Sequence, residues 1–141
     1  MPVRKSNARW EGDLKSGEGR MALGSGAFEG AFSYKTRFEQ GTGTNPEELV
    51  GAALAGCFSM QLSALLAADG HPPQSVQTES EVHFSTDSTP TIERIKLICH
   101  GEVPGLDSET FSQTAEKAKA MCPVSRLFQG LDIDLDVTFE D

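Results

Sequence analysis

Two cysteines are the side chains in this sequence best suited to covalent chemistry. Cys57 lies midway along an uncharged segment, and Cys122 directly precedes Pro123. The thiolate form of cysteine is both a nucleophile and a metal ligand. A free cysteine is also a common small apolar residue of protein interiors, so simple packing is the alternative role for Cys57. Cys99 continues an alternation of apolar residues, which predicts a packing role on a strand.

Two charged residues bracket the loop that precedes the uncharged segment. Arg37 comes before Gly41-Thr42-Gly43, and Glu47 follows it. Taken alone, Arg37 is typical of a solvated strand end. Glu47 is typical of a carboxylate that stabilises the positive end of a helix dipole.

Other chemistries lack the spacing that they require. The three cysteines and three histidines show no paired spacing of the C-x-x-C or H-x-x-x-H kind, so the sequence predicts no metal site. No histidine stands out as the base of a cysteine hydrolase. Gly24-Ser25-Gly26 lacks the following glycine and lysine of a phosphate-binding loop.

Length and charge narrow the class of protein. The chain has 141 residues, which predicts a single domain over 1–141. Its net charge of −9 and pI near 4.7 argue against binding to nucleic acid or to an anionic membrane surface. The first residues have no apolar core like that of a signal peptide. A cytoplasmic location, where thiols stay reduced, is therefore expected.

The uncharged segment is predicted to be a helix from Pro46 to Ala68. Asn45 can cap the first amides, Pro46 suits the first helical position, and Gly70 suits the end. Its length would span a bilayer, but its many small residues and acidic flanks argue against a membrane span. We expect a helix buried on nearly all sides, and a chain this small needs a second copy to cover it. The helix therefore predicts a homodimer.

The remaining segments alternate between strand and helix patterns, which predicts an α+β protein. Strands are expected at Ala8–Leu14, Phe28–Phe38, Ser75–Ser85, Thr91–His100 and Leu131–Val137, and a helix is expected to open at Asp107 or Ser108 and to break at Cys122-Pro123.

Four short motifs in combination resemble the OsmC and organic hydroperoxide resistance family. They are Thr36-Arg37-Phe38-Glu39, Gly43-Thr44-Asn45-Pro46-Glu47-Glu48-Leu49, Ala55-Gly56-Cys57-Phe58 and Cys122-Pro123-Val124-Ser125. The resemblance covers most of the chain, including Trp10-Glu11-Gly12-Asp13 near its start. It implies a fold of antiparallel sheets around a long central helix, assembled as an intertwined homodimer.

The resemblance also implies an activity and the residues that carry it. The family members are thiol peroxidases that use no metal or flavin cofactor, prefer organic hydroperoxides and are typically reduced by lipoyl dithiols. The peroxidatic thiol corresponds to Cys57 and the resolving thiol to Cys122. Arg37 corresponds to the residue that favours the thiolate, and Glu47 to the carboxylate that holds Arg37 through a two-point contact. An apolar wall for the substrate tail is expected from Leu54, Phe58, Met60 and Phe128.

Helix geometry adds one constraint on such a site. Glu47 and Cys57 are ten residues apart, which is about 15 Å along a helix, and they lie on different faces. If both serve one site, antiparallel packing of two copies of the helix would bring Glu47 of one subunit near Cys57 of the other. Two other classes of function remain open from sequence: a lipid-binding or acyl-binding dimer, and a structural dimerisation domain whose cysteines only pack.

Overall fold

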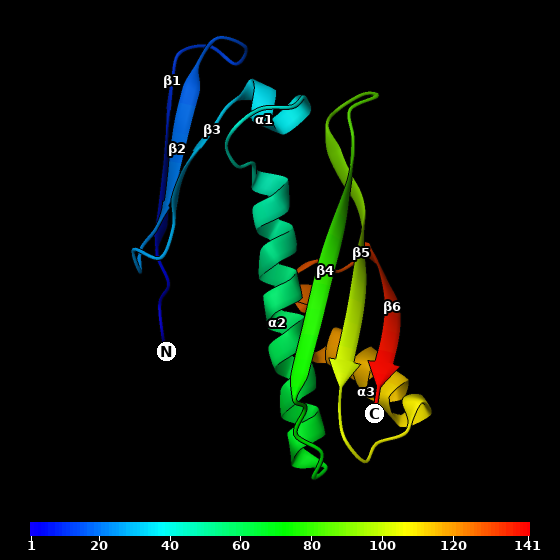
Figure 1. Cartoon of the computed structure of the whole chain (residues 1–141). Coiled ribbons are helices and arrows are strands. Elements are labelled where there is room, and N and C mark those ends of the chain that lie inside the picture. Colours follow the sequence, from blue (N-terminus) through cyan, green and yellow to red (C-terminus); the bar gives the residue numbers. More distant parts are fainter. The chain divides into compact units, whose positions relative to one another are not determined.

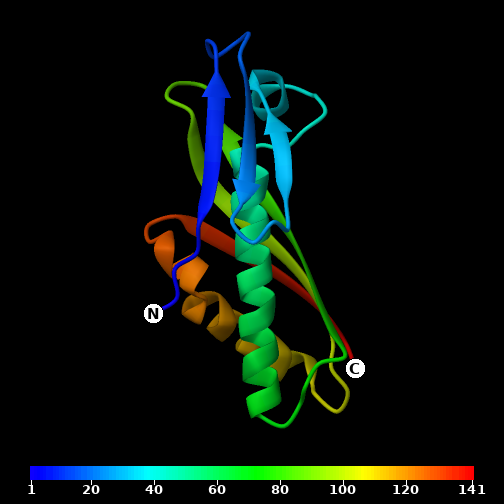
Figure 2. The same ribbon diagram turned by 90° about the vertical axis from the view of Figure 1, so that its left-hand side faces the viewer.

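The computed structural model describes residues 1–141, which divide into unit 1, Met1–Leu49, and unit 2, Val50–Asp141. Unit 1 begins with an antiparallel sheet of β1 (Ser6–Glu11), β2 (Glu18–Leu23) and β3 (Glu29–Phe32), drawn in blue in Figure 2. Trp10 packs on Phe32 across this sheet, with ring centroids 5.4 Å apart. A short helix, α1 (Tyr34–Phe38), follows the sheet.

Helix α1 corrects the prediction of one continuous strand from Phe28 to Phe38. The cause is a capping box at Ser33. Its hydroxyl accepts a hydrogen bond from the Thr36 amide at 3.2 Å, and the Thr36 hydroxyl accepts one from the Ser33 amide at 2.9 Å. Arg37 therefore lies on a helical turn and not at a strand end.

The first strand, predicted at Ala8–Leu14, begins and ends earlier than expected, at Ser6–Glu11. It ends at Glu11 because the chain turns at Gly12, whose φ of 93° favours glycine. Strand β2 (Glu18–Leu23) lies between the strands predicted at Ala8–Leu14 and Phe28–Phe38, in a segment where no strand was expected from the sequence.

The long helix α2 (Pro46–Ala68) has the bounds predicted from the sequence. At its start, the Asn45 side chain accepts a hydrogen bond from the Glu48 amide at 2.8 Å. At its end, Gly70 has a φ of 85°, and the His71 amide donates to the Leu66 carbonyl at 2.9 Å. By length and composition alone, α2 is also long and apolar enough to cross a membrane.

Unit 2 is built on a second sheet with the order β4 (Ser75–Ser85), β5 (Thr91–Glu102) and β6 (Asp132–Glu140). Strands β4 and β5 are antiparallel, whereas β5 and β6 are parallel. The parallel pair corrects the expectation of purely antiparallel sheets. It arises because α3 (Ser108–Met121) and α4 (Pro123–Leu127) form a crossover between β5 and β6.

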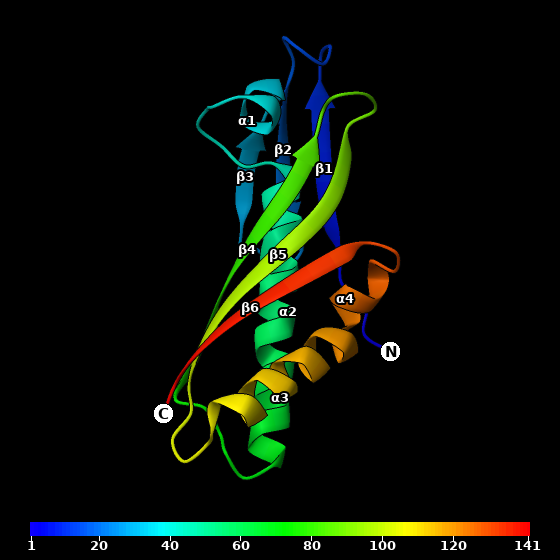
Figure 3. The same cartoon turned by 90° about the vertical axis from the view of Figure 1, so that its right-hand side faces the viewer.

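One face of this sheet is covered by helices. Figures 1 and 3 show α2 and α3 on the same side of β4, β5 and β6, with the other side free of helices of unit 2. The buried core on the covered side comprises Leu54, Phe58, Leu62 and Leu66 of α2, Ile95, Leu97 and Cys99 of β5, Phe111, Ala115 and Ala118 of α3, and Val103, Leu106 and Cys122.

In the single chain helix α2 is buried on one face, and its burial on nearly all sides, which the sequence predicts for a homodimer, stays a prediction. Its buried apolar residues recur at four-residue intervals from Leu54 to Leu66. The opposite face carries small residues and Met60, whose exposed fraction is 76%. In the single chain this uncharged face is open to solvent, because the one sheet of unit 2 covers only one side of the helix.

A close contact between β5 and α3 gives a stability prediction. A Cβ atom at Gly101 would lie 2.4 Å from the ring of Phe111, which packs on Phe139 with centroids 5.0 Å apart. We expect Gly101→Ala to lower the free energy of unfolding by about 1–3 kcal/mol, because the aromatic ring must shift in a packed core. Urea unfolding measures the change.

The double variant Gly101→Ala/Phe111→Leu is the control for this mechanism. The smaller side chain leaves room for the new methyl group, so adding Gly101→Ala to Phe111→Leu should cost less than adding it to the wild type. Equal costs in the two backgrounds would contradict the steric explanation.

Candidate active site

The candidate site residues form two groups, one in each unit. In unit 1, helix α1 presents Arg37 to Glu47 in the first turn of α2. The Arg37 Nε and Nη2 atoms donate hydrogen bonds to Glu47 Oε1 at 3.0 and 2.8 Å. Thr36 helps to hold this arrangement, because its carbonyl accepts a hydrogen bond from the Asn45 side chain at 3.2 Å. The predicted pairing of Arg37 with Glu47 is present.

The form of that contact differs from the expected one. Two nitrogen atoms of the one guanidinium group donate to the same carboxylate oxygen, so the contact is not the parallel two-oxygen fork. The second oxygen, Glu47 Oε2, is buried and has no hydrogen-bond partner within the chain. The Glu47 side chain is 10% exposed and the Arg37 side chain 37% exposed, so Arg37 is the more accessible partner of this ion pair. A buried acceptor without a partner marks a place where a further donor would be favourable.

In unit 2, the two candidate cysteines are in direct contact. Cys57 projects from α2, and Cys122 lies at the junction between α3 and α4, with the two Sγ atoms 2.6 Å apart. The break at Pro123 produces this junction, because proline cannot continue α3 and instead starts α4. Both cysteines are free thiols in this structure, with Cys57 half-buried and Cys122 fully buried.

The two thiols titrate as a pair and not as independent groups. Burial raises the pKa of Cys57, and its hydrogen bond with Cys122 raises it further. Burial also acts to raise the pKa of Cys122. The hydrogen bond with Cys57, together with those from Ser125 and the Val124 amide, outweighs burial and lowers the Cys122 pKa below its usual value. Within unit 2, the first negative charge is therefore favoured on Cys122.

The amides that support these thiols were not predicted from the sequence. The backbone N–H groups of Val124 and Ser125 lie in the first turn of α4 and stabilise negative charge on the sulfur atoms. The signal was present in the sequence, because a proline at the first helical position leaves the following amides without helical partners. Cys99 is fully buried in the core, in agreement with its predicted packing role.

An apolar pocket of about 240 Å³ adjoins Arg37 within unit 1. Its lining residues are mostly aromatic: Trp10, Leu14, Phe32, Ser33, Tyr34, Arg37 and Phe38. The Arg37 guanidinium also lies over the Phe38 ring, 5.4 Å from its centroid. An organic group in this pocket would have a cation at its edge.

The residues that line this pocket differ from the apolar wall of Leu54, Phe58, Met60 and Phe128 predicted from the sequence. Leu54 and Phe58 are completely buried in the core of unit 2 and cannot line an open surface. Met60 is exposed on α2 and Phe128 is half-buried. The sequence prediction was wrong for the two buried residues because α2 directs their side chains to the sheet.

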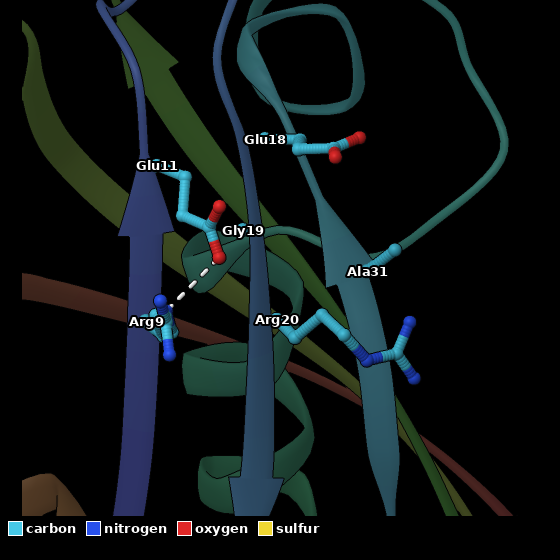
Figure 4. Close-up of a pocket in the computed structure, with 6 residues that line it drawn as sticks. All are labelled: Arg9, Glu11, Glu18, Gly19, Arg20 and Ala31. Atoms are coloured by element: carbon cyan, nitrogen blue, oxygen red, sulfur yellow. Dashed lines mark ion pairs between the residues drawn. The ribbon is translucent and has the colours of Figure 1, made fainter.

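A second pocket of unit 1 is lined mostly by charged residues. It has a volume of about 250 Å³ and is lined by Arg9, Glu11, Glu18, Gly19, Arg20 and Ala31, as Figure 4 shows. Its arginines already have partners, because Arg9 pairs with Glu11 at 3.0 Å and Arg20 pairs with Glu29 at 3.2 Å. These exposed ion pairs are typical of a solvated sheet surface and not of a catalytic centre.

Comparison with known proteins adds independent information. Residues 39–136 match the family model described as "OsmC-like protein". The chain is 44% identical over 135 residues to "Peroxiredoxin OsmC" of Escherichia coli, and the match covers 94% of each chain. It is 33% identical over 99 residues to "Organic hydroperoxide resistance protein" of Xanthomonas axonopodis, covering 70% of this chain and 68% of the relative.

Solved structures show the same fold. An OsmC-like protein from Mycoplasma pneumoniae gives a TM-score of 0.78 at 16% identity and covers 99% of both chains. The organic hydroperoxide resistance protein OhrB of Bacillus subtilis gives a TM-score of 0.72 at 20% identity, covering 95% of this chain and 98% of that one. The α+β fold predicted from the sequence is therefore confirmed.

The thiol contact predicts a change in pH behaviour when one partner is removed. The pKa of Cys122 is lowered by a hydrogen bond from Cys57, so Cys57→Ala should raise it. The first thiolate should then appear at higher pH than in the wild type. Ultraviolet absorbance of the thiolate during a pH titration measures this onset.

Cys99→Ala is the matched control. Burial raises the pKa of Cys99, whereas the pKa of Cys122 is lowered, so Cys99 ionises after Cys122 and its loss should leave the onset unchanged. A Cys57→Ala titration with the same onset as the wild type would mean that the contact does not stabilise the Cys122 thiolate.

Proposed function

The chain belongs to the OsmC-like family and is a cysteine-based peroxidase, and from this premise we propose that Cys57 attacks the hydroperoxide and Cys122 resolves the product. The observation that carries this assignment is the 2.6 Å contact between the two sulfur atoms. A disulfide needs about 2.05 Å between sulfurs, so a small movement suffices to join them. Cys99 is buried in the core and takes no part.

The proposed reaction has three balanced steps. The Cys57 thiolate attacks the terminal oxygen of the hydroperoxide, the O–O bond breaks, and the alkoxide takes a proton and leaves as an alcohol. Cys57 is then a sulfenic acid. The Cys122 thiolate attacks the Cys57 sulfur to form the disulfide, the S–O bond of the sulfenic acid breaks, and the hydroxide takes a proton and leaves as water. A dithiol reductant finally restores both thiols by exchange.

Arg37 is proposed to supply the cation that the first step needs. Within unit 2 the pKa of Cys57 is raised by burial, so its thiolate requires stabilisation from outside that unit. A guanidinium can both favour the thiolate and donate hydrogen bonds to the peroxide oxygens. Glu47 holds Arg37 through one oxygen. In this proposal the two groups of residues act in one active site.

The substrate is an organic hydroperoxide, and we assign its tail to the pocket beside Arg37. Four aromatic rings line that pocket, and its volume of about 240 Å³ suits a small apolar group. A molecule with an apolar tail and a polar –OOH end matches a pocket that is apolar inside and cationic at its edge. The lipid-binding alternative accounts for the pocket but not for the paired thiols.

The active assembly is proposed to be a homodimer that packs through the open face of α2. This face is uncharged and, apart from Met60, built of small residues, and a Cβ atom at Gly56 would have no neighbour within 4 Å in the single chain. Small residues allow close approach of two helices, and burial of this face would explain why α2 lacks charged residues along most of its length. The intertwined dimer implied by the family resemblance is consistent with this packing.

The separation of Glu47 and Cys57 along α2 leads us to propose that each active site takes residues from both subunits. Glu47 and Cys57 belong to one uninterrupted helix, so they lie about 15 Å apart along its axis. Antiparallel packing of two α2 helices would bring Glu47 of one subunit close to Cys57 of the other.

We propose a lipoyl-type dithiol as the reductant. We propose the cytoplasm as the location, where a reducing pool keeps both thiols available.

Steady-state peroxidase assays test the function. With cumene hydroperoxide as substrate and dihydrolipoamide as reductant, we expect turnover by the wild type and at least a thousandfold loss in Cys57→Ser. The serine hydroxyl is a far weaker nucleophile than a thiolate. Cys122→Ser should complete one oxidation and accumulate a sulfenic acid that dimedone traps.

Cys99→Ser serves as the control, because it changes a cysteine of the core outside the proposed chemistry. It should keep its turnover number. After mild oxidation, peptide mapping should recover Cys57 joined to Cys122 within one chain. Turnover in Cys57→Ser, or a disulfide that contains Cys99, would refute the assignment.

Subunit complementation tests the shared site. Glu47→Ala and Cys57→Ser homodimers should each be inactive or nearly so, for different reasons. A heterodimer of the two should recover about half of the wild-type activity, because one of its two sites keeps both residues. Tagged subunits allow the heterodimer to be purified before assay. A purified heterodimer without activity would place Glu47 and Cys57 in the same chain's site.

A further inference from the structure

The sheet face of unit 2 that lies away from the helices carries a cluster of metal-ligating side chains. His100 and Glu102 are on β5, and Glu140 is on β6. One ligand atom from each residue lies within 4.8 Å of the others. His100 and Glu102 are two positions apart on one strand, so they share a face, and Glu140 is the direct partner of Glu102 in the parallel register.

The histidine ring is held by a residue outside the cluster. His100 Nδ1 and the Thr138 hydroxyl are hydrogen-bonded at 2.6 Å, and Thr138 is the register partner of His100 on β6. The other ring nitrogen, Nε2, lies 3.5 Å from Glu140 Oε2. Metal-binding histidines commonly use one nitrogen for such an orienting hydrogen bond and the other for the metal.

The charges around the cluster favour a bound cation. Glu102 and Glu140 are carboxylates on adjacent strands at the same level, an arrangement of like charges that is unfavourable. Across β4, the register partners of His100 and Glu102 are the uncharged Gln77 and Ser75.

The basic residues on the same face of β5 are distant. Lys96 precedes His100 by four residues, about 13 Å along the strand. Arg94 lies farther away and pairs with Asp134. The chain thus places two carboxylates together without a lysine or arginine beside them.

We propose that His100, Glu102 and Glu140 bind a divalent transition-metal ion of the Zn²⁺ type. An imidazole with two carboxylates suits Zn²⁺, and a water molecule would occupy the fourth tetrahedral position. Ligands of a tetrahedral zinc ion lie about 3.4 Å apart, since each bond is about 2.0–2.2 Å. The His100–Glu140 separation already approaches this value, and rotation of the half-buried Glu102 carboxylate and the exposed Glu140 carboxylate completes the three-ligand set.

The ion would join the last strand to its neighbour. It takes ligands from both β5 and β6, close to the C-terminal end of β6. The cluster lies on the opposite face of the sheet from the core that contains Cys122, so the bound ion has no part in the thiol chemistry. The expected effect is on the stability of the β5–β6 pair.

Isothermal titration with ZnCl₂ tests the site. The double variant Cys57→Ser/Cys122→Ser is used as the parent, because thiolates themselves bind zinc. We expect one saturable Zn²⁺ per chain and a rise in the melting temperature with Zn²⁺ concentration. In this parent, His100→Gln should weaken binding at least tenfold. Thr138→Val, which removes only the orienting hydroxyl, should weaken it by about 10–100-fold.

His83→Gln is the matched control. His83 lies on the same face and faces Glu81 at 3.7 Å, but it has no second carboxylate in a three-ligand cluster. This variant should bind Zn²⁺ as the parent does. The proposal is overturned if the parent shows no saturable binding, or if His100→Gln binds Zn²⁺ as tightly as the parent.

Discussion

The contact between Cys57 and Cys122 depends on a single backbone constraint, the proline at position 123. Without it, α3 could continue past Cys122 and carry that side chain around the helix axis. Pro123 ends α3 and starts α4, so Cys122 is both the C-cap residue of α3 and the N-cap residue of α4. The first amides of α4 then point back to the sulfur atoms. One residue thus fixes both the position and the ionisation of the thiol pair.

Cys57 and Cys122 differ in both pKa and exposure, and these differences suit the two different roles that we propose for them. The second thiol of a peroxidase must ionise readily, because it attacks a sulfenic acid that oxidises further if it persists. Cys122 has a lowered pKa and is fully buried, which suits a thiol that meets only its partner. Cys57 is the more accessible of the two but has a raised pKa, so the proposed mechanism needs a cation to activate it. Cys57 is thus the more accessible thiol, and Cys122 is the thiol that ionises more readily.

Features that depend on neighbouring residues could be predicted from the sequence. Features that depend on contacts between distant residues could not. The bounds of α2 follow from Asn45, Pro46 and Gly70, which act within a few residues of the helix ends. Helix α1 was missed because apolar and polar residues alternate through it as in a strand, and only the Ser33 cap distinguishes them. The parallel pairing of β6, like the sharing of one Glu47 oxygen by two donors of Arg37, is set by tertiary packing.

The parallel pairing of β5 and β6 also bears on the order in which the chain folds. Their register partners, such as His100 and Thr138, are 38 residues apart, and the whole α3–α4 crossover must be closed before they meet. Contacts of this separation carry a larger loop-closure entropy than the β4–β5 hairpin and form more slowly. Cys122 lies inside that crossover. During synthesis, β4 and β5 can pair while α3, α4 and β6 are still being made, so the thiol pair is completed late in folding.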